Sequence, residues 1–194
     1  MIDDKQLTEE YLDGKVVFPG KIIRVEHWHV RLPNGETALR EVACHPGAAG
    51  IVALDDDGNV ILVRQHRIAV GRLTLEIPAG KLDGLDEDPF VCAQRELSEE
   101  TGASCETLTP LGEILASPGG FTEVLHLYMA TGLTFGSQHP DEDEFINFER
   151  VPFDALLDRC LSGDLRDGKT VAGVLKVYAL RTRKKEAAAA ASFS

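Results

Sequence analysis

Apolar and polar residues alternate along several short segments of the first 80 residues, which is the pattern of half-buried β-strands. The alternation runs over 21–44 and is interrupted at Pro33-Asn34-Gly35, where the Asn-Gly pair predicts a hairpin turn. A second strand pair is predicted at 50–55 and 60–67, joined by a turn rich in Asp and Gly. Residues 73–80 predict one further strand that ends at a Pro-Ala-Gly turn. The first part of the chain is therefore expected to be rich in β-structure.

One helix with clear end signals is predicted at 88–101. Asp88 is expected to be its N-cap, Pro89 its first residue and Gly102 its stop. The positions that recur near helical spacing, and are expected to face a core, are Phe90, Ala93, Leu97 and Thr101.

The second half of the chain predicts strands at 107–115, 123–131 and 145–151, and helices at 153–162 and 169–184. From Lys184 onward the sequence KKEAAAAASFS is expected to be frayed or disordered. The pattern predicts an α+β chain in three parts, which are an N-terminal β region at 1–46, a main domain at 47–184 and a disordered tail at 185–194.

Composition narrows the class of protein. The chain has 194 residues, of which 43% are hydrophobic and 27% charged, as in a globular protein. It has no apolar run near the roughly 20 residues that span a bilayer, and its acidic start does not resemble a secretion signal. A cytoplasmic protein without membrane partners is expected.

Charge and cysteine usage exclude further classes. The formal net charge of -12 argues against non-specific nucleic-acid binding, because the field would repel phosphates. A phosphate-bearing ligand would therefore need metal ions or arginines at its site. Four cysteines without a C-x-x-C pair are expected to be reduced and to hold neither zinc nor disulfides; they are Cys44, Cys92, Cys105 and Cys160.

Three glutamates of the predicted helix share one side. Glu96, Glu99 and Glu100 stand at i, i+3 and i+4, a spacing at which like charges destabilise a helix by a few tenths of a kcal/mol per pair. Divalent cations would offset this repulsion, since magnesium binds carboxylates together with phosphate oxygens. A solvated acidic face is the alternative interpretation.

The segment from Gly80 to Ala103 resembles the Nudix box, G-x5-E-x7-R-E-U-x-E-E-x-G-U, where U is aliphatic. Glu87 is followed by seven residues and then by Arg95-Glu96-Leu97-Ser98-Glu99-Glu100-Thr101-Gly102-Ala103. Six residues, instead of five, separate Gly80 from Glu87, so either Glu87 or Asp86 matches the first glutamate of the family pattern. Glu87 is expected to orient other groups.

The resemblance implies a Nudix α/β/α sandwich with a mixed sheet, plus a small N-terminal antiparallel sheet used in dimerisation. It implies Mg²⁺, or Mn²⁺, with two or three ions per site. Glu96 and Glu100 resemble the principal ligands, Glu99 an additional one, and the carbonyl of Ala79 a further one. Arg95 resembles the arginine that orients the glutamates.

The general base of related enzymes is a glutamate on a loop outside the box. Residues 139–145 form an acidic segment that suits this role, in which Glu144 is favoured over Glu142. An acidic solvated loop is the alternative.

Segments outside the box resemble the ADP-ribose pyrophosphatases of this family. Ser117 to Glu123 contains Ser-Pro-Gly, and Pro118 stands fifteen residues after Ala103. The resemblance extends over stretches between Arg40 and Gly80. The candidate substrate contacts are Trp28, Arg40, Arg67, Arg72, Glu76, Pro118 and Gly119, of which Arg67 and Arg72 can supply positive charge for the diphosphate.

The expected activity is Mg²⁺-dependent hydrolysis of the pyrophosphate of ADP-ribose to AMP and ribose 5-phosphate by a homodimer. Trp28 is expected either to stack on adenine or to pack between sheets. Alternatives are a Nudix hydrolase for another diphosphate (GDP-mannose, a dinucleotide polyphosphate or NADH) and a Nudix-fold sensor that binds a nucleotide without cleaving it.

Overall fold

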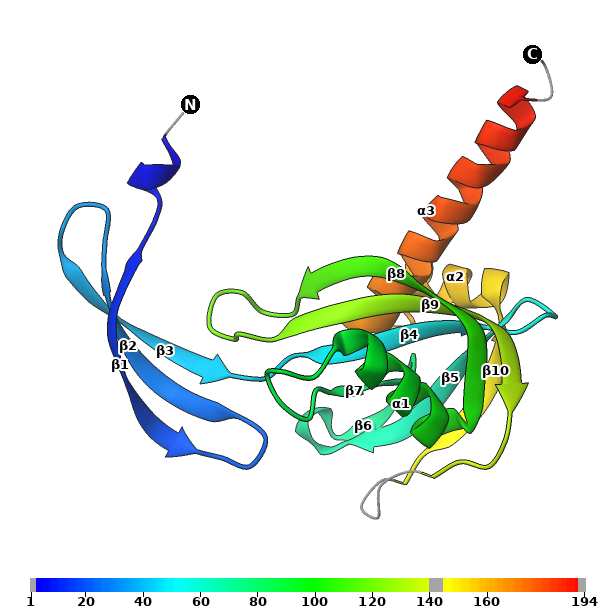
Figure 1. The fold of residues 1–194 in the computed structure, drawn as a ribbon, viewed down its shortest axis with the longest axis horizontal. Helices are drawn as coiled ribbons and strands as arrows, with labels where there is room; N and C mark the ends of the chain where they lie inside the picture. The colour runs from blue at the N-terminus through cyan, green and yellow to red at the C-terminus, as the bar shows by residue number, and fades with distance from the viewer. Residues whose placement is uncertain (1–2, 140–144, 192–194) are drawn as a thin grey trace. The chain divides into compact units, whose positions relative to one another are not determined.

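The computed structural model describes residues 3–139 and 145–191, which form two compact units (Figure 1). The smaller unit combines the chain up to Gly47 with the segment Leu115–Val124. The larger unit contains Ala48–Ile114 and the chain from Leu125 onward. The sequence placed residues 115–124 in the main domain, whereas the structure groups them with the N-terminal strands.

The smaller unit contains a three-stranded antiparallel sheet in the order β1-β2-β3. Its strands are β1 (Glu10–Pro19), β2 (Arg24–Arg31) and β3 (Thr37–Cys44), and a short 3-10 helix, η1 (Asp4–Gln6), precedes them. The hairpin predicted at Asn34-Gly35 joins β2 to β3, and Gly35 adopts a φ of 88° that favours glycine. Strand β1 was not predicted, because all ten of its residues are exposed and give no apolar alternation.

The larger unit is built on a seven-stranded sheet in the order β10-β5-β4-β9-β8, with β6 paired to β5 and β7 to β4. Strands β4 and β9 are parallel, while the pairs β4–β5, β5–β10, β5–β6 and β4–β7 are antiparallel, so the sheet is mixed. The strands are β4 (Ala48–Leu54), β5 (Asn59–Arg67), β6 (Arg72–Glu76), β7 (Ala79–Lys81), β8 (Ala103–Leu115), β9 (Val124–Phe135) and β10 (Asn147–Pro152).

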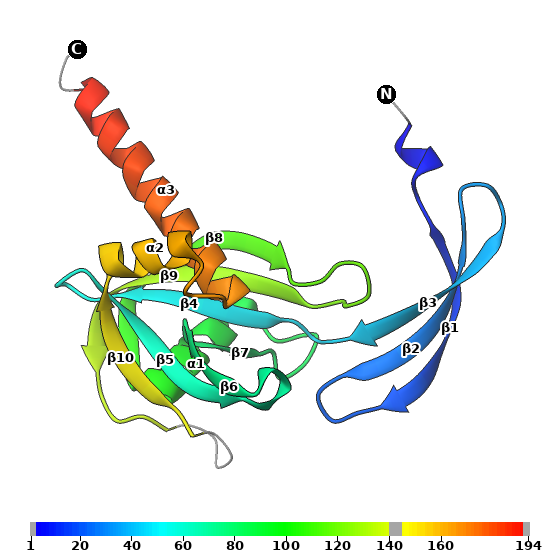
Figure 2. The ribbon, with the colours of Figure 1, turned by 180° about the vertical axis from the view of Figure 1, so that it is seen from behind.

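Three α-helices cover the two faces of this sheet. Helix α1 (Pro89–Thr101) lies on the face seen in Figure 1, and α2 (Phe153–Ser162) with the start of α3 (Gly168–Ala191) lies on the face seen in Figure 2. Every residue of β4 is buried. Because successive strand side chains point to opposite faces, Ile51 joins the core under α1 and Val52 the core under α2 and α3. This arrangement confirms the predicted α/β/α sandwich and the separate small sheet.

Three features differ from the sequence prediction. The single strand predicted at 73–80 is two strands, β6 and β7, which pair with different neighbours. Between β5 and β6 the chain also makes a 3-10 turn, η2 (Ile68–Val70). Helix α3 continues to Ala191, beyond the predicted end at 184, because alanine has the highest helix propensity. Within the described residues, no helix has the length and apolar character needed to cross a membrane.

The predicted ends of α1 are confirmed. The carboxylate of Asp88 accepts a hydrogen bond from the Phe90 N–H at 2.9 Å, and Gly102 ends the helix with a φ of 69°. The prediction of the buried stripe is wrong at Phe90, which is exposed, although its ring contacts Tyr128 edge-on. Ala93, Leu97 and Thr101 are buried as predicted.

Candidate active site

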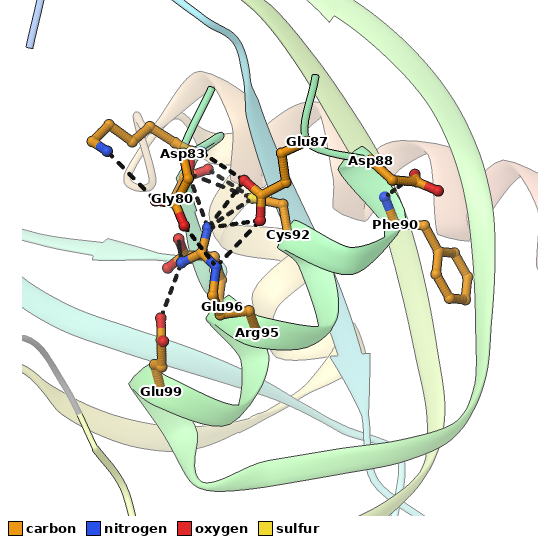
Figure 3. Close-up of polar contacts among 10 residues, drawn as sticks. Gly80, Asp83, Glu87, Asp88, Phe90, Cys92, Arg95, Glu96 and Glu99 are labelled. Carbon is orange, nitrogen blue, oxygen red and sulfur yellow. Dashed lines mark hydrogen bonds and ion pairs between the residues drawn. The ribbon is translucent and has the colours of Figure 1, made fainter. Parts of the chain in front are cut away.

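Two glutamates of α1 lie against the turn that begins β7. Glu100 is 2% exposed, and its carboxylate accepts a hydrogen bond from the Ala79 N–H at 2.9 Å. Glu96 is 9% exposed and lies directly over Gly80 (Figure 3). A Cβ at Gly80 would lie 2.0 Å from the Glu96 carboxylate, so only glycine leaves room for that side chain. The two carboxylates therefore lie together beside the backbone of Ala79 and Gly80.

Arg95 is hydrogen-bonded to the acidic side of the same helix. Its Nη1 donates to Glu96 at 2.6 Å and to Glu99 at 3.1 Å, and its Nη2 donates to the Lys81 carbonyl at 3.1 Å (Figure 3). Burial would lower the pKa of Arg95, but the carboxylates of Glu96 and Glu87 raise it well above its usual value. Arg95 is therefore a fixed cation that sets the positions of two of the three glutamates.

Before the helix, Glu87 contacts Arg95 at 3.4 Å, and Asp83 contacts it at 3.8 Å. Its carboxylate also accepts a hydrogen bond from the Asp83 N–H at 2.6 Å. That backbone hydrogen bond, followed by the contact with Arg95, lowers the pKa of Glu87. The extra residue between Gly80 and Glu87 is thus accommodated in a loop that Glu87 itself closes.

Cys92 is buried beside these groups, and its Sγ lies 3.5 Å from the Lys81 carbonyl oxygen. Burial, together with nearby Glu96, raises the pKa of the thiol to about 12. The thiol is therefore neutral beside these groups. Cys160 is also buried, Cys44 and Cys105 are half-buried, and all four cysteines are free.

The donor chemistry around α1 fits a hard divalent cation. Carboxylate and carbonyl oxygens are the ligands that magnesium accepts, and it usually takes only one or two carboxylates together with water and phosphate. In the parts of the chain that the structure describes, no three His, Cys, Asp or Glu side chains are gathered closely enough to form a metal site alone. The glutamates instead bond to Arg95 and to the Ala79 N–H. An ion held here would thus draw on backbone or substrate oxygens as well.

Arg67 and Glu76, both predicted to contact substrate, form an ion pair in which Glu76 is buried and Arg67 is exposed. Arg67 donates from Nε and Nη2 to the two carboxylate oxygens of Glu76, each at 2.8 Å. Glu76 also bonds to Thr74 and to Lys169. Burial alone would raise the pKa of Glu76, but Arg67 and Lys169 outweigh it and lower the pKa to about 2. Arg72 lines the same pocket as this pair.

Lys169 and Asp167 belong to this cluster and were missed from the sequence. Lys169 bonds to Glu76, from which it is separated by 93 positions, and to Asp167 at 3.0 Å. Asp167 caps α3 by accepting a hydrogen bond from the Thr170 N–H at 3.0 Å. The Asp-Gly-Lys-Thr sequence at the start of α3 is a cap signal that could have been recognised, but nothing in it identifies Glu76 as a partner.

The other residues predicted to contact substrate lie in the smaller unit. Trp28 is half-buried, donates to Glu26 at 2.6 Å and packs edge-on against Tyr11. Arg40 forms an ion pair with Glu9. The loop that contains Pro118 and Gly119 is hydrogen-bonded to β3 through Ala43, Gly120 and Thr122. The predicted residues thus fall into two groups, one in each unit.

The segment after β9 is hydrogen-bonded to the C-terminal end of α1. The Gly136 N–H donates to the Gly102 carbonyl at 2.6 Å, the His139 N–H to the Glu99 carbonyl at 3.0 Å, and the Gln138 side-chain amide to the Glu100 carbonyl at 2.5 Å. Glu142 and Glu144, the two candidates for the general base, lie outside the described residues.

Comparison with known proteins defines the class. Residues 45–172, more than half of the chain, match the family model of the NUDIX domain. The match spans the box and the sheet on which its helix packs. The chain therefore belongs to the Nudix family.

Particular relatives extend this similarity over most of the chain. This chain is 37% identical over 172 residues to the methanol dehydrogenase activator of Bacillus methanolicus (the match covers 88% of this chain and 92% of the relative). It is 38% identical over 168 residues to the ADP-ribose pyrophosphatase of Bacillus subtilis (86% and 90%). It is also 37% identical over 189 residues to the GDP-mannose pyrophosphatase of Salmonella arizonae (88% and 90%). A solved ADP compounds hydrolase shares the fold, with a TM-score of 0.79, 23% identity, and coverage of 92% of this chain and 97% of that one.

Proposed function

We propose that this chain hydrolyses the pyrophosphate of ADP-ribose, in a Mg²⁺-dependent reaction that yields AMP and ribose 5-phosphate. The observation that carries the proposal is the intact set of box glutamates, with Glu96 and Glu100 buried beside the start of β7 and Arg95 bonded to the set. The similarity to an ADP-ribose pyrophosphatase over most of both chains supports the choice of substrate.

Glu96, Glu99, Glu100 and the Ala79 carbonyl are proposed to hold the two or three ions. A bound divalent ion would neutralise the diphosphate and lower the pKa of a bound water. The chain's own contribution begins with Arg95, which keeps Glu96 and Glu99 oriented. With these acids fixed before substrate arrives, little reorganisation is needed when charge develops during the reaction.

Arg67 and Arg72 are proposed to bind the diphosphate, with Glu76 holding Arg67 in place. Glu76 accepts hydrogen bonds from the Nε–H and one Nη2–H of Arg67. The other three of the five N–H groups of this guanidinium have no partner among the described side chains. This second edge can accept a phosphate in the forked geometry that arginine favours. Contacts from the smaller unit are proposed for Trp28, Arg40, Pro118 and Gly119.

The general base is proposed to be Glu144, with Glu142 as the alternative. The support for this choice is that residues 136–139, which lead toward both, are hydrogen-bonded to the helix that carries the metal-binding acids. A base held near that helix would remove a proton from the attacking water, a contribution of about 10²–10⁴-fold.

A homodimer is also proposed. In the smaller unit, large apolar side chains are exposed on β1, in the turn after it and on β3, which is unusual for a surface without a partner. They are Tyr11, Leu12, Val16, Val17, Phe18, Ile22 and Leu39.

The first test is to replace a metal-binding acid. Glu100→Gln or Glu96→Gln should lower kcat for ADP-ribose by at least about 10²-fold, since carboxylate ligands cannot be replaced by neutral amides without losing charge. The matched control is Glu186→Gln, the same change at an exposed helical position of α3, which should leave kcat unchanged. Full activity in either box variant, measured as AMP release with magnesium, would contradict the proposal.

A second candidate substrate is GDP-mannose, which the similarity to a GDP-mannose pyrophosphatase favours. Initial rates on ADP-ribose and GDP-mannose at low concentration, with and without chelator, give the two values of kcat/KM. A higher kcat/KM for GDP-mannose would make GDP-mannose, and not ADP-ribose, the preferred substrate. Tight binding of ADP-ribose without any product, even after long incubation with magnesium, would identify a sensor instead.

A further inference from the structure

A polar pocket of about 580 Å³ lies in the larger unit, between β6 and the loop that joins α2 to α3. Its lining contains no residue of the Nudix box, which places it outside the group of acids on α1. It takes side chains from three separate parts of the chain, which are the β5–β6 region, the end of α2 and the start of α3.

The pocket is cationic in a chain whose net charge is -12. Six basic side chains line it, and only three acidic ones do. The basic side chains are Arg64, Arg67, Arg72, Arg159, Arg166 and Lys169, and the acidic ones are Glu76, Asp164 and Asp167. Such a local reversal of the field attracts anions to this position.

Part of this charge is neutralised within the protein. Arg67 and Lys169 pair with Glu76 and Asp167, and these four charges sum to zero. Arg64 pairs with Glu149, which stands outside the pocket. These pairs make this part of the wall electrically balanced.

The remaining three arginines have no such partner. Arg72, Arg159 and Arg166 make no side-chain hydrogen bond or ion pair with any described residue, and Arg159 is half-buried. A half-buried guanidinium without a carboxylate loses hydration without compensation, so an anion from outside the chain would stabilise it. Set against Asp164, the three arginines leave an excess of two positive charges.

We propose that this pocket binds a sugar phosphate, whose phosphate is held by Arg72, Arg159 and Arg166. A phosphate monoester carries about -1.5 to -2 at neutral pH, which matches the excess positive charge. The volume exceeds what a phosphate ion needs and falls within the roughly 300–1,000 Å³ of small-molecule sites. The polar wall around Thr74, Asp164 and Asp167 offers hydrogen-bond partners for sugar hydroxyls.

The sugar phosphate can come from two sources, which share a ribose joined to a phosphate group. It is either the sugar-phosphate half of a bound substrate or a free sugar phosphate, such as the product of the reaction. Arg67 forms one wall of the pocket, and its unpartnered edge is the proposed contact for the diphosphate, so a substrate bound there would extend toward Arg159. The choice of ribose 5-phosphate as probe rests on the proposed function.

The test is direct binding by calorimetry on the full chain with chelator present, so that no hydrolysis is required. Ribose 5-phosphate, inorganic phosphate and ribose are titrated separately. The variant Arg159→Gln with Arg166→Gln should weaken binding of ribose 5-phosphate at least about tenfold, which corresponds to the loss of one charge-assisted contact. Arg72→Gln tests the same site from another element.

The matched control is Arg183→Gln with Lys184→Gln, which removes two exposed cations of α3 outside the pocket. It should change binding less than twofold. Equal weakening in both double variants would assign the effect to net charge and overturn the proposal. So would a parent chain that does not bind ribose 5-phosphate, or one that binds inorganic phosphate as tightly.

The KM for ADP-ribose then separates the two sources. A rise in KM in the Arg159, Arg166 variant, with competitive inhibition by ribose 5-phosphate, assigns the pocket to the substrate. An unchanged KM assigns it to a free sugar phosphate. If the chain binds ribose 5-phosphate through these arginines but releases no AMP, the proposed sugar-phosphate site stands. Only the proposed hydrolysis is then refuted.

Discussion

Gly80 is the residue on which the position of Glu96 depends most directly, because a Cβ there would lie 2.0 Å from the carboxylate. We expect Gly80→Ala to displace Glu96 and its contact with Arg95, and so to lower kcat at least about tenfold while costing about 1–3 kcal/mol of stability. Thermal unfolding and AMP release measure the two effects.

Gly84→Ala is the control for that change. Gly84 lies in the loop that follows β7, and a Cβ there has nothing within 4 Å. It should leave both activity and unfolding temperature near the parent values. Equal activity in the two variants would show that the space above Gly80 does not matter.

At the scale of single residues, the sequence predicts features that depend only on residues close together along the chain. Asp88, Pro89 and Gly102 mark the ends of α1 because capping depends on neighbouring backbone groups. The spacing of the box also identified the family correctly. The pair of Glu76 with Lys169 could not be predicted, because their contact depends on how β6 and α3 come together.

At the scale of elements, the end of α1 is joined to the segment that follows β9. Gln138→Ala removes the hydrogen bond from its side chain to the Glu100 carbonyl. The cost in stability should be about 1 kcal/mol. Residues 136–139 lead to the proposed base. The variant should therefore also have a lower kcat, although it remains folded.

Ser137→Ala is the matched control, since Ser137 is exposed in the same segment and should affect neither quantity. Chemical unfolding and kcat for ADP-ribose are compared across the two variants. If Gln138→Ala keeps the full kcat, the segment does not position the base.

Strand β6 and helix α3 are joined by an acid-sensitive contact. Glu76 has a pKa of about 2 in the folded chain, against an ordinary value of 4.5. A lowered pKa contributes stability that is complete above about pH 4.5 and is lost as the pH falls toward 2. We expect Glu76→Gln to destabilise the chain at pH 7 by on the order of 3 kcal/mol.

The difference between parent and Glu76→Gln should shrink by about half at pH 3, as measured by urea unfolding at both pH values. Glu149→Gln, which breaks the exposed pair with Arg64, serves as the control and should cost less than about 1 kcal/mol at pH 7. A difference for Glu76→Gln that does not change with pH would contradict the assigned ionisation.

Burial leaves an apolar pattern along an element, and this pattern is what the sequence prediction depended on. Strand β3 and helix α2 follow apolar patterns because part of each is buried. Strand β1 has no buried residue, so it left no pattern to recognise. The division between β6 and β7 depends on their different partners, which a single run of apolar residues does not reveal.

At the scale of the whole molecule, the apolar surface of β1 is the feature that bears on assembly. Phe18→Asp should halve the molar mass measured by light scattering if this surface joins two chains, because a buried charge without a partner opposes association. Leu161→Asp is the control, as an exposed leucine of α2 in the larger unit. A parent chain that is monomeric at micromolar concentration would refute the homodimer.

The parallel pairing of β4 with β9 sets the order in which the chain can fold. Helix α1 is complete at Thr101, yet the core beneath it includes Tyr128 and Ala130 of β9. Pairing segments this far apart requires a large loop to close first, which slows folding. During synthesis, the acids of α1 therefore remain without their full support until the chain beyond Phe135 has left the ribosome.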